Sequence, residues 1–173
     1  MLFHQTRLEK MKIKSLTIAL IASLATVLGT SSCSSDDDEP EAPVATQVAG
    51  SYTGNEIVIV MGDESSNDTK TYQFTKASDT SVDMTVPEMG MGGMMTIPPF
   101  AVKNIPLTKS GNSITGKVGS YSGTVKNAKG EEKAYVVSNV TLMFSDKNAV
   151  VTFSLKYGNM PMAMETTFTG TRK

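Results

Sequence analysis

Apolar and polar residues alternate along most of the chain from residue 44 onwards, and no sustained helical period occurs there. The clearest example runs from Ala149 to Tyr157, where every second residue is apolar and Thr152, Ser154 and Lys156 fall between. Such alternation is typical of β-strands that bury one face and expose the other. Turn-forming residues separate the alternating runs. The pattern predicts eight strands, at roughly 51–61, 69–77, 81–87, 97–109, 112–126, 133–145, 149–157 and 162–171.

Most links between these runs are short, which favours an up-and-down meander in which each strand pairs with the next. Closing the meander into a ring removes both exposed sheet edges. A β-sandwich is the competing fold, but its crossing connections need longer links than most of these. We therefore expect an all-β domain built as an eight-stranded antiparallel up-and-down barrel. Side chains fill the interior of such a barrel, or it holds one small ligand.

A basic segment and then an apolar segment precede the alternating region. Four basic residues lie between positions 7 and 14, and residues 15–29 are apolar with many small side chains. This stretch is shorter than the ~20 residues that a membrane-spanning helix needs. It is typical of the core of a secretory signal peptide. We expect a signal peptide over residues 1–32, with Met11 as an alternative start.

Cys33 follows this segment at the place of the acylated cysteine of bacterial lipoproteins. Residues 33–39 read Cys-Ser-Ser-Asp-Asp-Asp-Glu and resemble a lipoprotein anchor with the acidic export signal of some Gram-negative surface lipoproteins. The resemblance implies that an acyl group on Cys33 holds the protein on the outer membrane, exposed at the cell surface. The acidic and proline-containing run that follows predicts a solvated tether over residues 33–45.

The body beyond the tether is poor in catalytic chemistry. His4 and Cys33 are the only histidine and cysteine, so residues 46–173 contain neither. That region cannot build a Ser-His-Asp triad, a Cys-His nucleophile, a Cys/His zinc site or a disulfide. Its basic and acidic side chains nearly balance, which gives no indication of a nucleic-acid partner. We therefore predict a protein that is not an enzyme, with no catalytic residues, no cofactor and no metal site.

The two ends of the alternating region resemble one known family. Residues 48–54 read Val-Ala-Gly-Ser-Tyr-Thr-Gly, and residues 167–173 read Thr-Phe-Thr-Gly-Thr-Arg-Lys. Both look like the ends of the calycin-like β-barrel domain of bacterial lipoproteins. The resemblance covers about residues 46–173 and implies a lipocalin-related barrel, in a family whose members mostly lack an assigned activity.

Tyr52 and Arg172 are candidates for closing the barrel. Lipocalins carry Gly-x-Trp on the first strand, with a basic residue from the barrel's end packed on the Trp. Here residues 50–52 read Gly-Ser-Tyr, and Arg172 is the candidate basic partner. Because a closed meander places its first and last strands side by side, we expect Tyr52 near Arg172, with the guanidinium within ~6 Å of the ring. The alternative is a plain core tyrosine and an arginine that frays with the terminus.

Methionines are the one compositional clue to a ligand. Two short stretches hold seven of the twelve in the chain, one within 89–95 and the other within 160–164. In an up-and-down meander both stretches belong to links at the same end, as do the long links 62–68 and 127–132. The opposite end is expected to have only short turns. The candidate ligand-binding residues are Met89, Met91, Met94, Met95, Met160, Met162 and Met164.

Three interpretations of this cluster stay open. The methionines could be adaptable packing that fills the barrel end. They could form a mouth that binds an apolar small molecule or an apolar patch of another envelope protein. They could also ligate Cu(I) through thioether sulfurs. The leading hypothesis is the binding mouth, and the alternative is a solid barrel that docks as a structural or accessory subunit on a larger envelope complex. A binding barrel requires a cavity between residues 87–96 and 158–164.

Overall fold

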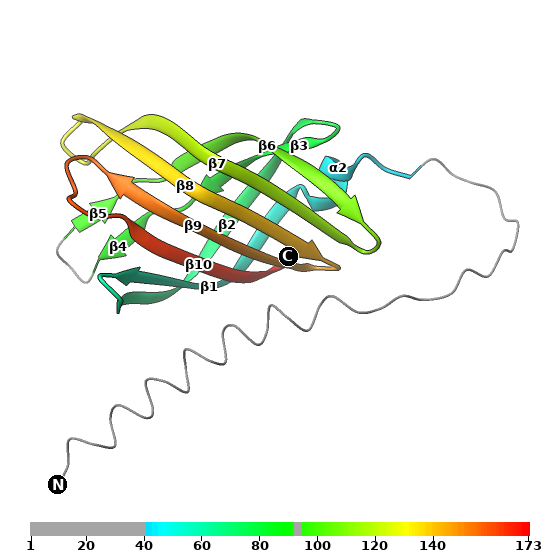
Figure 1. Ribbon diagram of the computed structural model, residues 1–173, viewed down its shortest axis with the longest axis horizontal. Coiled ribbons are helices and arrows are strands. Elements are labelled where there is room, and N and C mark those ends of the chain that lie inside the picture. Colours follow the sequence, from blue (N-terminus) through cyan, green and yellow to red (C-terminus); the bar gives the residue numbers. More distant parts are fainter. Residues whose placement is uncertain (1–40, 92–94) are drawn as a thin grey trace, which may run out of the picture. The chain divides into compact units, whose positions relative to one another are not determined.

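The computed structural model describes residues 41–91 and 95–173 (Figure 1). Cys33, Met94 and the whole expected signal peptide lie outside the described residues, as does the expected tether up to residue 40. Across the described ranges, no helix combines the length and hydropathy needed to cross a membrane.

Eight antiparallel strands form a closed barrel, which confirms the predicted fold class. Their order around the ring is β1-β10-β9-β8-β7-β6-β3-β2, so neighbours in the ring follow one another along the chain. Strands β4 and β5 pair only with each other, as a small hairpin between β3 and β6. The strands are β1 (Gly50–Val60), β2 (Asp63–Ser78), β3 (Ser81–Val86), β4 (Met89–Met91), β5 (Met95–Ile97), β6 (Phe100–Ser110), β7 (Ser113–Lys126), β8 (Glu132–Ser145), β9 (Asn148–Tyr157) and β10 (Met164–Arg172).

One predicted link and one predicted strand differ from the observed segments. The expected long polar link over 62–68 is instead the start of β2, which pairs with β1 up to Val60↔Asp63 after a tight turn at Met61 and Gly62. Here most residues on both faces are solvated, so no alternation marks the strand. The predicted strand 97–109 begins only at Phe100, because two prolines interrupt it and Ile97 belongs to β5.

Side chains that point into the barrel fill most of its interior. Tyr52, Phe74 and Phe144 pack as an aromatic cluster, with ring centroids 5.0–5.6 Å apart. The rings of Tyr72 and Phe168 stack at 4.2 Å in the same interior. The largest fully buried side chains are Tyr52, Tyr72, Phe74, Phe153, Phe168, Met84, Met89, Ile97, Ile105, Leu142, Leu155 and Met164.

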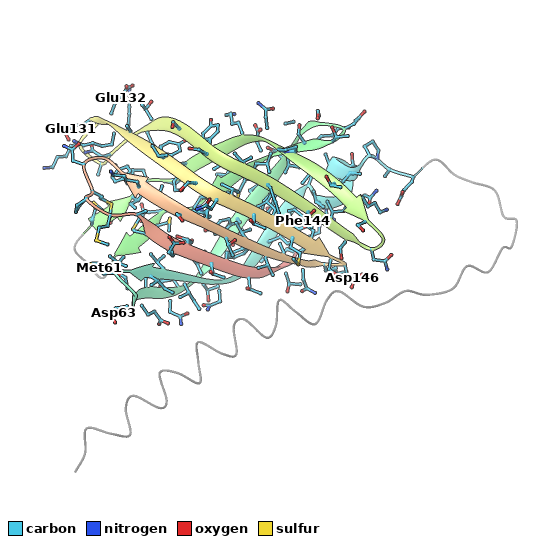
Figure 2. The ribbon with its side chains drawn as sticks, in the orientation of Figure 1. Met61, Asp63, Glu131, Glu132, Phe144 and Asp146 are labelled. Atoms are coloured by element: carbon cyan, nitrogen blue, oxygen red, sulfur yellow. The ribbon has the colours of Figure 1, made fainter. Side chains whose placement is uncertain are left out.

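A short helix, α2 (Val44–Val48), covers one end of the barrel. Ala45 and Val48 are buried in the core, and the Ala45 amide donates to the Asp79 carbonyl of the β2–β3 turn at 3.1 Å. The β2–β3, β6–β7 and β8–β9 links at this end are short turns, as expected. The sequence analysis did not predict the covering helix, because five residues are too few to show a helical period. The covered end also carries the β8–β9 turn at Asp146 (Figure 2).

The other end of the barrel is called the mouth below. Figure 2 shows Met61 and Asp63 at this end together with Glu131 and Glu132, so the β1–β2 turn and the β7–β8 link share it. Figure 1 shows the β4–β5 hairpin and the link between β9 and β10 there as well. The fold therefore has one end covered by a helix and one end surrounded by connecting segments.

Candidate functional site

The structure brings residues of both methionine stretches to the mouth. Met89 and Met164 are fully buried and belong to the core, whereas Met95 and Met160 are partly buried and pack against it. Met162 is 46% exposed and faces solvent. The backbone of Met91 lies in β4, while Met94 is outside the described residues. The described methionine side chains thus form two groups. Met89 and Met164 belong to the core, whereas Met95, Met160 and Met162 lie at the edge of the mouth, which is called the rim below.

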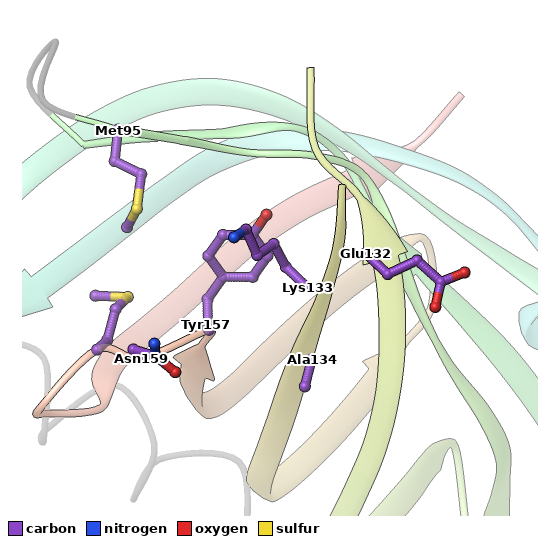
Figure 3. A pocket seen from close by; sticks show the side chains of 8 residues that line it. Met95, Glu132, Lys133, Ala134, Tyr157 and Asn159 are labelled. Carbon is purple, nitrogen blue, oxygen red and sulfur yellow. The ribbon is translucent and has the colours of Figure 1, made fainter. Parts of the chain in front are cut away.

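A pocket of about 550 Å³ lies at the mouth between β5, β8 and the β9–β10 link. Met95 and Met160 line it together with Tyr157, which ends β9. Figure 3 shows Met95 and Tyr157 projecting into the pocket, while the carboxylate of Glu132 points away from it. The remaining lining residues are Glu132, Lys133, Ala134, Gly158 and Asn159.

Tyr157 gives this pocket a polar group without a partner. Its side chain is 6% exposed, and its hydroxyl is buried with no hydrogen-bond partner among the described residues. A buried hydroxyl left unpaired is unfavourable by roughly 1–3 kcal/mol. The pocket is therefore lined by flexible apolar side chains and by Tyr157, whose unpaired hydroxyl is buried rather than open to the pocket.

At the covered end, Tyr52 and Arg172 lie opposite each other on β1 and β10. The Arg172 Cζ lies 5.9 Å from the centroid of the Tyr52 ring. The guanidinium also donates to the carbonyls of Gln47, at 2.8 Å, and Ala49 at the end of α2. The Tyr52 hydroxyl donates to the Val48 carbonyl at 3.1 Å. Together, these contacts of Tyr52 and Arg172 join the first strand, the last strand and the covering helix, far from the mouth.

A buried carboxyl group inside the barrel was not among the sequence candidates. Glu56 of β1 is 0% exposed, and its Oε2 accepts a hydrogen bond from the Tyr72 hydroxyl at 2.6 Å. Burial raises the pKa of Glu56 above its ordinary value, and the Tyr72 hydrogen bond and nearby Lys70 only partly oppose that shift. Burial and the adjacent Glu56 raise the pKa of Tyr72 as well, so its hydroxyl stays protonated and donates.

The sequence does contain a signal for Glu56. Tyr52, Glu56 and Val58 are separated by even numbers of residues, so they share one face of the strand. Tyr52 and Val58 are the apolar residues that predict this face to be buried. A glutamate in that register is therefore an acid expected inside the barrel, and the structure places it there.

We expect the pH dependence of stability to report on Glu56. Because its pKa in the folded state is raised, the folded barrel loses stability as pH rises from about 4.5, the ordinary value, through the folded pKa. Glu56→Gln removes the titration and keeps an acceptor for Tyr72. The variant should gain on the order of 1 kcal/mol relative to the parent across that pH window, as measured by urea unfolding.

The exposed Glu64 on β2 offers a matched control, because Glu64→Gln makes the same chemical change outside the core. Its replacement should change stability by less than about 0.5 kcal/mol, because surface substitutions of this kind are tolerated. A stability difference between Glu56→Gln and the parent that does not vary with pH would show that the buried carboxyl group does not titrate differently on folding.

The comparisons with known proteins agree with this geometry. The calycin-like beta-barrel domain matches residues 48–171. The chain belongs to that family. A candidate outer membrane protein of Bacteroides fragilis NCTC 9343 has a similar solved structure, with a TM-score of 0.59 and 19% sequence identity over 76% of this chain and 53% of that one. At this identity the likeness shows the fold alone, and the calycin-like chain spans about half the length of that protein. No curated protein matches it.

Proposed function

We propose that this calycin-like barrel is a non-catalytic binding protein that holds a small apolar molecule at its mouth. The observation that carries the proposal is the pocket of about 550 Å³ lined by Met95, Tyr157 and Met160. Its volume falls within the roughly 300–1,000 Å³ of small-molecule sites, which are mostly apolar with a few polar groups. The unpaired Tyr157 hydroxyl is buried, so a ligand would reach it only if the lining side chains rearrange.

Other features support a site at the rim rather than deep in the barrel. Large side chains fill the interior, and α2 covers the far end. Met95 and Met160 are unbranched and can change rotamer, so they can adapt to ligands of different shape. An acyl anchor on Cys33 and exposure at the surface of the outer membrane belong to the same proposal. They are supported by the sequence pattern and by the similar fold of a candidate outer membrane protein.

The filled interior also favours a second candidate, an accessory subunit that docks on a larger envelope complex. In that case the mouth would contact a protein rather than a small molecule. Met162, which is 46% exposed on the β9–β10 link, would be part of the contact. The two candidates differ in whether the isolated protein binds an apolar small molecule.

Titration with N-phenyl-1-naphthylamine, a neutral apolar dye, tests the binding site. We expect saturable binding, with dye fluorescence rising as the dye leaves water. Met160→Asp should weaken it by roughly tenfold or more, since a charge would replace an apolar lining residue. Met61→Asp is the matched control. Met61 is 76% exposed at the same end of the barrel and does not line the pocket. Absence of saturable binding, or equal losses in the two variants, would contradict the proposal.

A further inference from the structure

Three buried side-chain oxygens, on β1, β2 and β10, lack hydrogen-bond partners within the described ranges. They are Glu56 Oε1, Thr166 Oγ1 and Ser66 Oγ. Glu56 is 0% exposed and Thr166 is 2% exposed, while Ser66 is partly exposed with a buried hydroxyl. Each unpaired buried polar atom is unfavourable by roughly 1–3 kcal/mol. Three such oxygens on neighbouring strands therefore indicate a binding partner that would satisfy them.

The strand register gathers these oxygens on one wall of the barrel. Val58 of β1 pairs with Ser66 of β2 on one side and with Thr166 of β10 on the other. Glu56 lies two residues before Val58 and so points to the same face. β10 begins at the mouth with Met164, and Thr166 is the next residue of that strand that points into the barrel. The oxygens thus lie on the inner wall just below the methionine rim.

The chemistry of these oxygens restricts what could satisfy them. Glu56 disfavours an anion, and an apolar group would leave every oxygen unpaired. The Lys70 ammonium does not hydrogen-bond to Glu56: its Nζ donates to the Glu88 carbonyl at 2.8 Å and lies 3.9 Å from Asp68 Oδ2. A primary ammonium group has three N–H donors and a charge that compensates a carboxylate. Its three donors match the acceptors in number, and its charge is opposite in sign to that of the Glu56 carboxylate.

We propose that Glu56, Thr166 and Ser66 bind a primary ammonium group, and that the ligand of this barrel is an amine with an apolar body. The inference rests on the proposed function, because the apolar body would occupy the methionine-lined mouth. Entry of the head group requires the Met164 side chain to move aside. Met164 is fully buried, but methionine is flexible and changes rotamer readily.

Isothermal titration calorimetry of the purified full chain with three eight-carbon probes tests the inference. The probes are octylammonium, octanol and N,N,N-trimethyloctylammonium. Octylammonium should bind at least tenfold more tightly than octanol, because a charge-assisted hydrogen bond adds more than about 1.4 kcal/mol. The quaternary ammonium carries the same charge but no N–H donor, so it should also bind at least tenfold more weakly than octylammonium.

Variants separate the head-group site from the mouth. Glu56→Gln should weaken octylammonium binding by tenfold or more and change octanol binding by less than threefold. Thr166→Val keeps the volume, removes one acceptor and should weaken octylammonium binding several-fold. Glu64→Gln, an exposed carboxyl change on β2, should leave both affinities unchanged.

The outcomes distinguish this inference from the proposed function. Binding of octanol and octylammonium with equal affinity would overturn the ammonium site, as expected if waters satisfy the three oxygens, and would leave the apolar mouth intact. Octylammonium binding that survives Glu56→Gln would also overturn the site. Failure of every probe to bind, together with failure of the apolar dye, would overturn the proposed function itself.

Discussion

Replacing Gly54 with valine should open the barrel at the seam between its first and last strands. Gly54 of β1 pairs with Gly170 of β10, and a Cβ on Gly54 would overlap the Thr169 carbonyl oxygen and the Gly170 Cα. These are backbone atoms, so no side-chain rotamer can relieve the clash. We expect Gly54→Val to lower the free energy of unfolding by at least about 4 kcal/mol or to prevent folding, as measured by circular dichroism during urea titration.

Gly119 in β7 provides the control for this substitution. It is exposed in a strand, and a Cβ at this position meets nothing within 4 Å. Gly119→Val should change stability by less than about 0.5 kcal/mol, because surface positions of this kind tolerate substitution and valine suits a strand. If both variants were equally stable, the close approach at Gly54 would not be what holds the seam.

The sequence predicted the barrel because most of its strands bury one face. β9 shows this plainly, since Ala149, Val151, Phe153, Leu155 and Tyr157 all point inward and all are apolar. Successive links of a meander alternate between the two ends of the barrel, and this placed both methionine stretches at one end. Met95 and Met160 line one pocket there. Alternation and connectivity are local properties of the chain, which is why they could be read without coordinates.

The misses have a common physical reason. The first residues of β2 are polar on both faces, and the backbone ladder with β1 holds them in a strand without any apolar pattern. α2 is too short for periodicity, and contacts with distant residues such as Asp79 and Arg172 stabilise it. Which methionines are buried depends on packing across the barrel, and that information is absent from spacing along the chain.

Glu56 shows the same limit from the other side. The alternation of side chains along β1 places Glu56 inside the barrel. Which residues surround it depends on how β1 pairs with β2 and β10. Tyr72 is sixteen residues away in sequence, and Thr166 is on the last strand of the barrel. Pairing along two seams of the ring assembles the polar wall that we propose as a head-group site.

Arg172→Ala should release the helix that covers the far end of the barrel. The guanidinium holds the carbonyls of Gln47 and Ala49 and lies over the Tyr52 ring. Hydrogen bonds to charged groups contribute about 1.5–3 kcal/mol each. We expect a loss of roughly 3 kcal/mol in the free energy of unfolding, discounted below the sum because Arg172 is partly exposed. Urea unfolding measures it.

Hydrogen exchange shows whether this loss is local to α2. The Ala49 amide donates to the Ala45 carbonyl at 2.9 Å, and the Ala45 amide donates to Asp79 at 3.1 Å. In Arg172→Ala both amides should lose more protection than amides in β8 and β9, since the lost hydrogen bonds are those that hold Gln47 and Ala49. Arg172→Lys should recover less than half of the stability, because a single ammonium cannot reproduce the guanidinium fork that bonds two carbonyls while covering a ring. Lys173→Ala, an exposed neighbour, should change neither measurement. Unchanged protection of α2 in Arg172→Ala would mean that burial of Ala45 and Val48 alone holds the helix on the barrel.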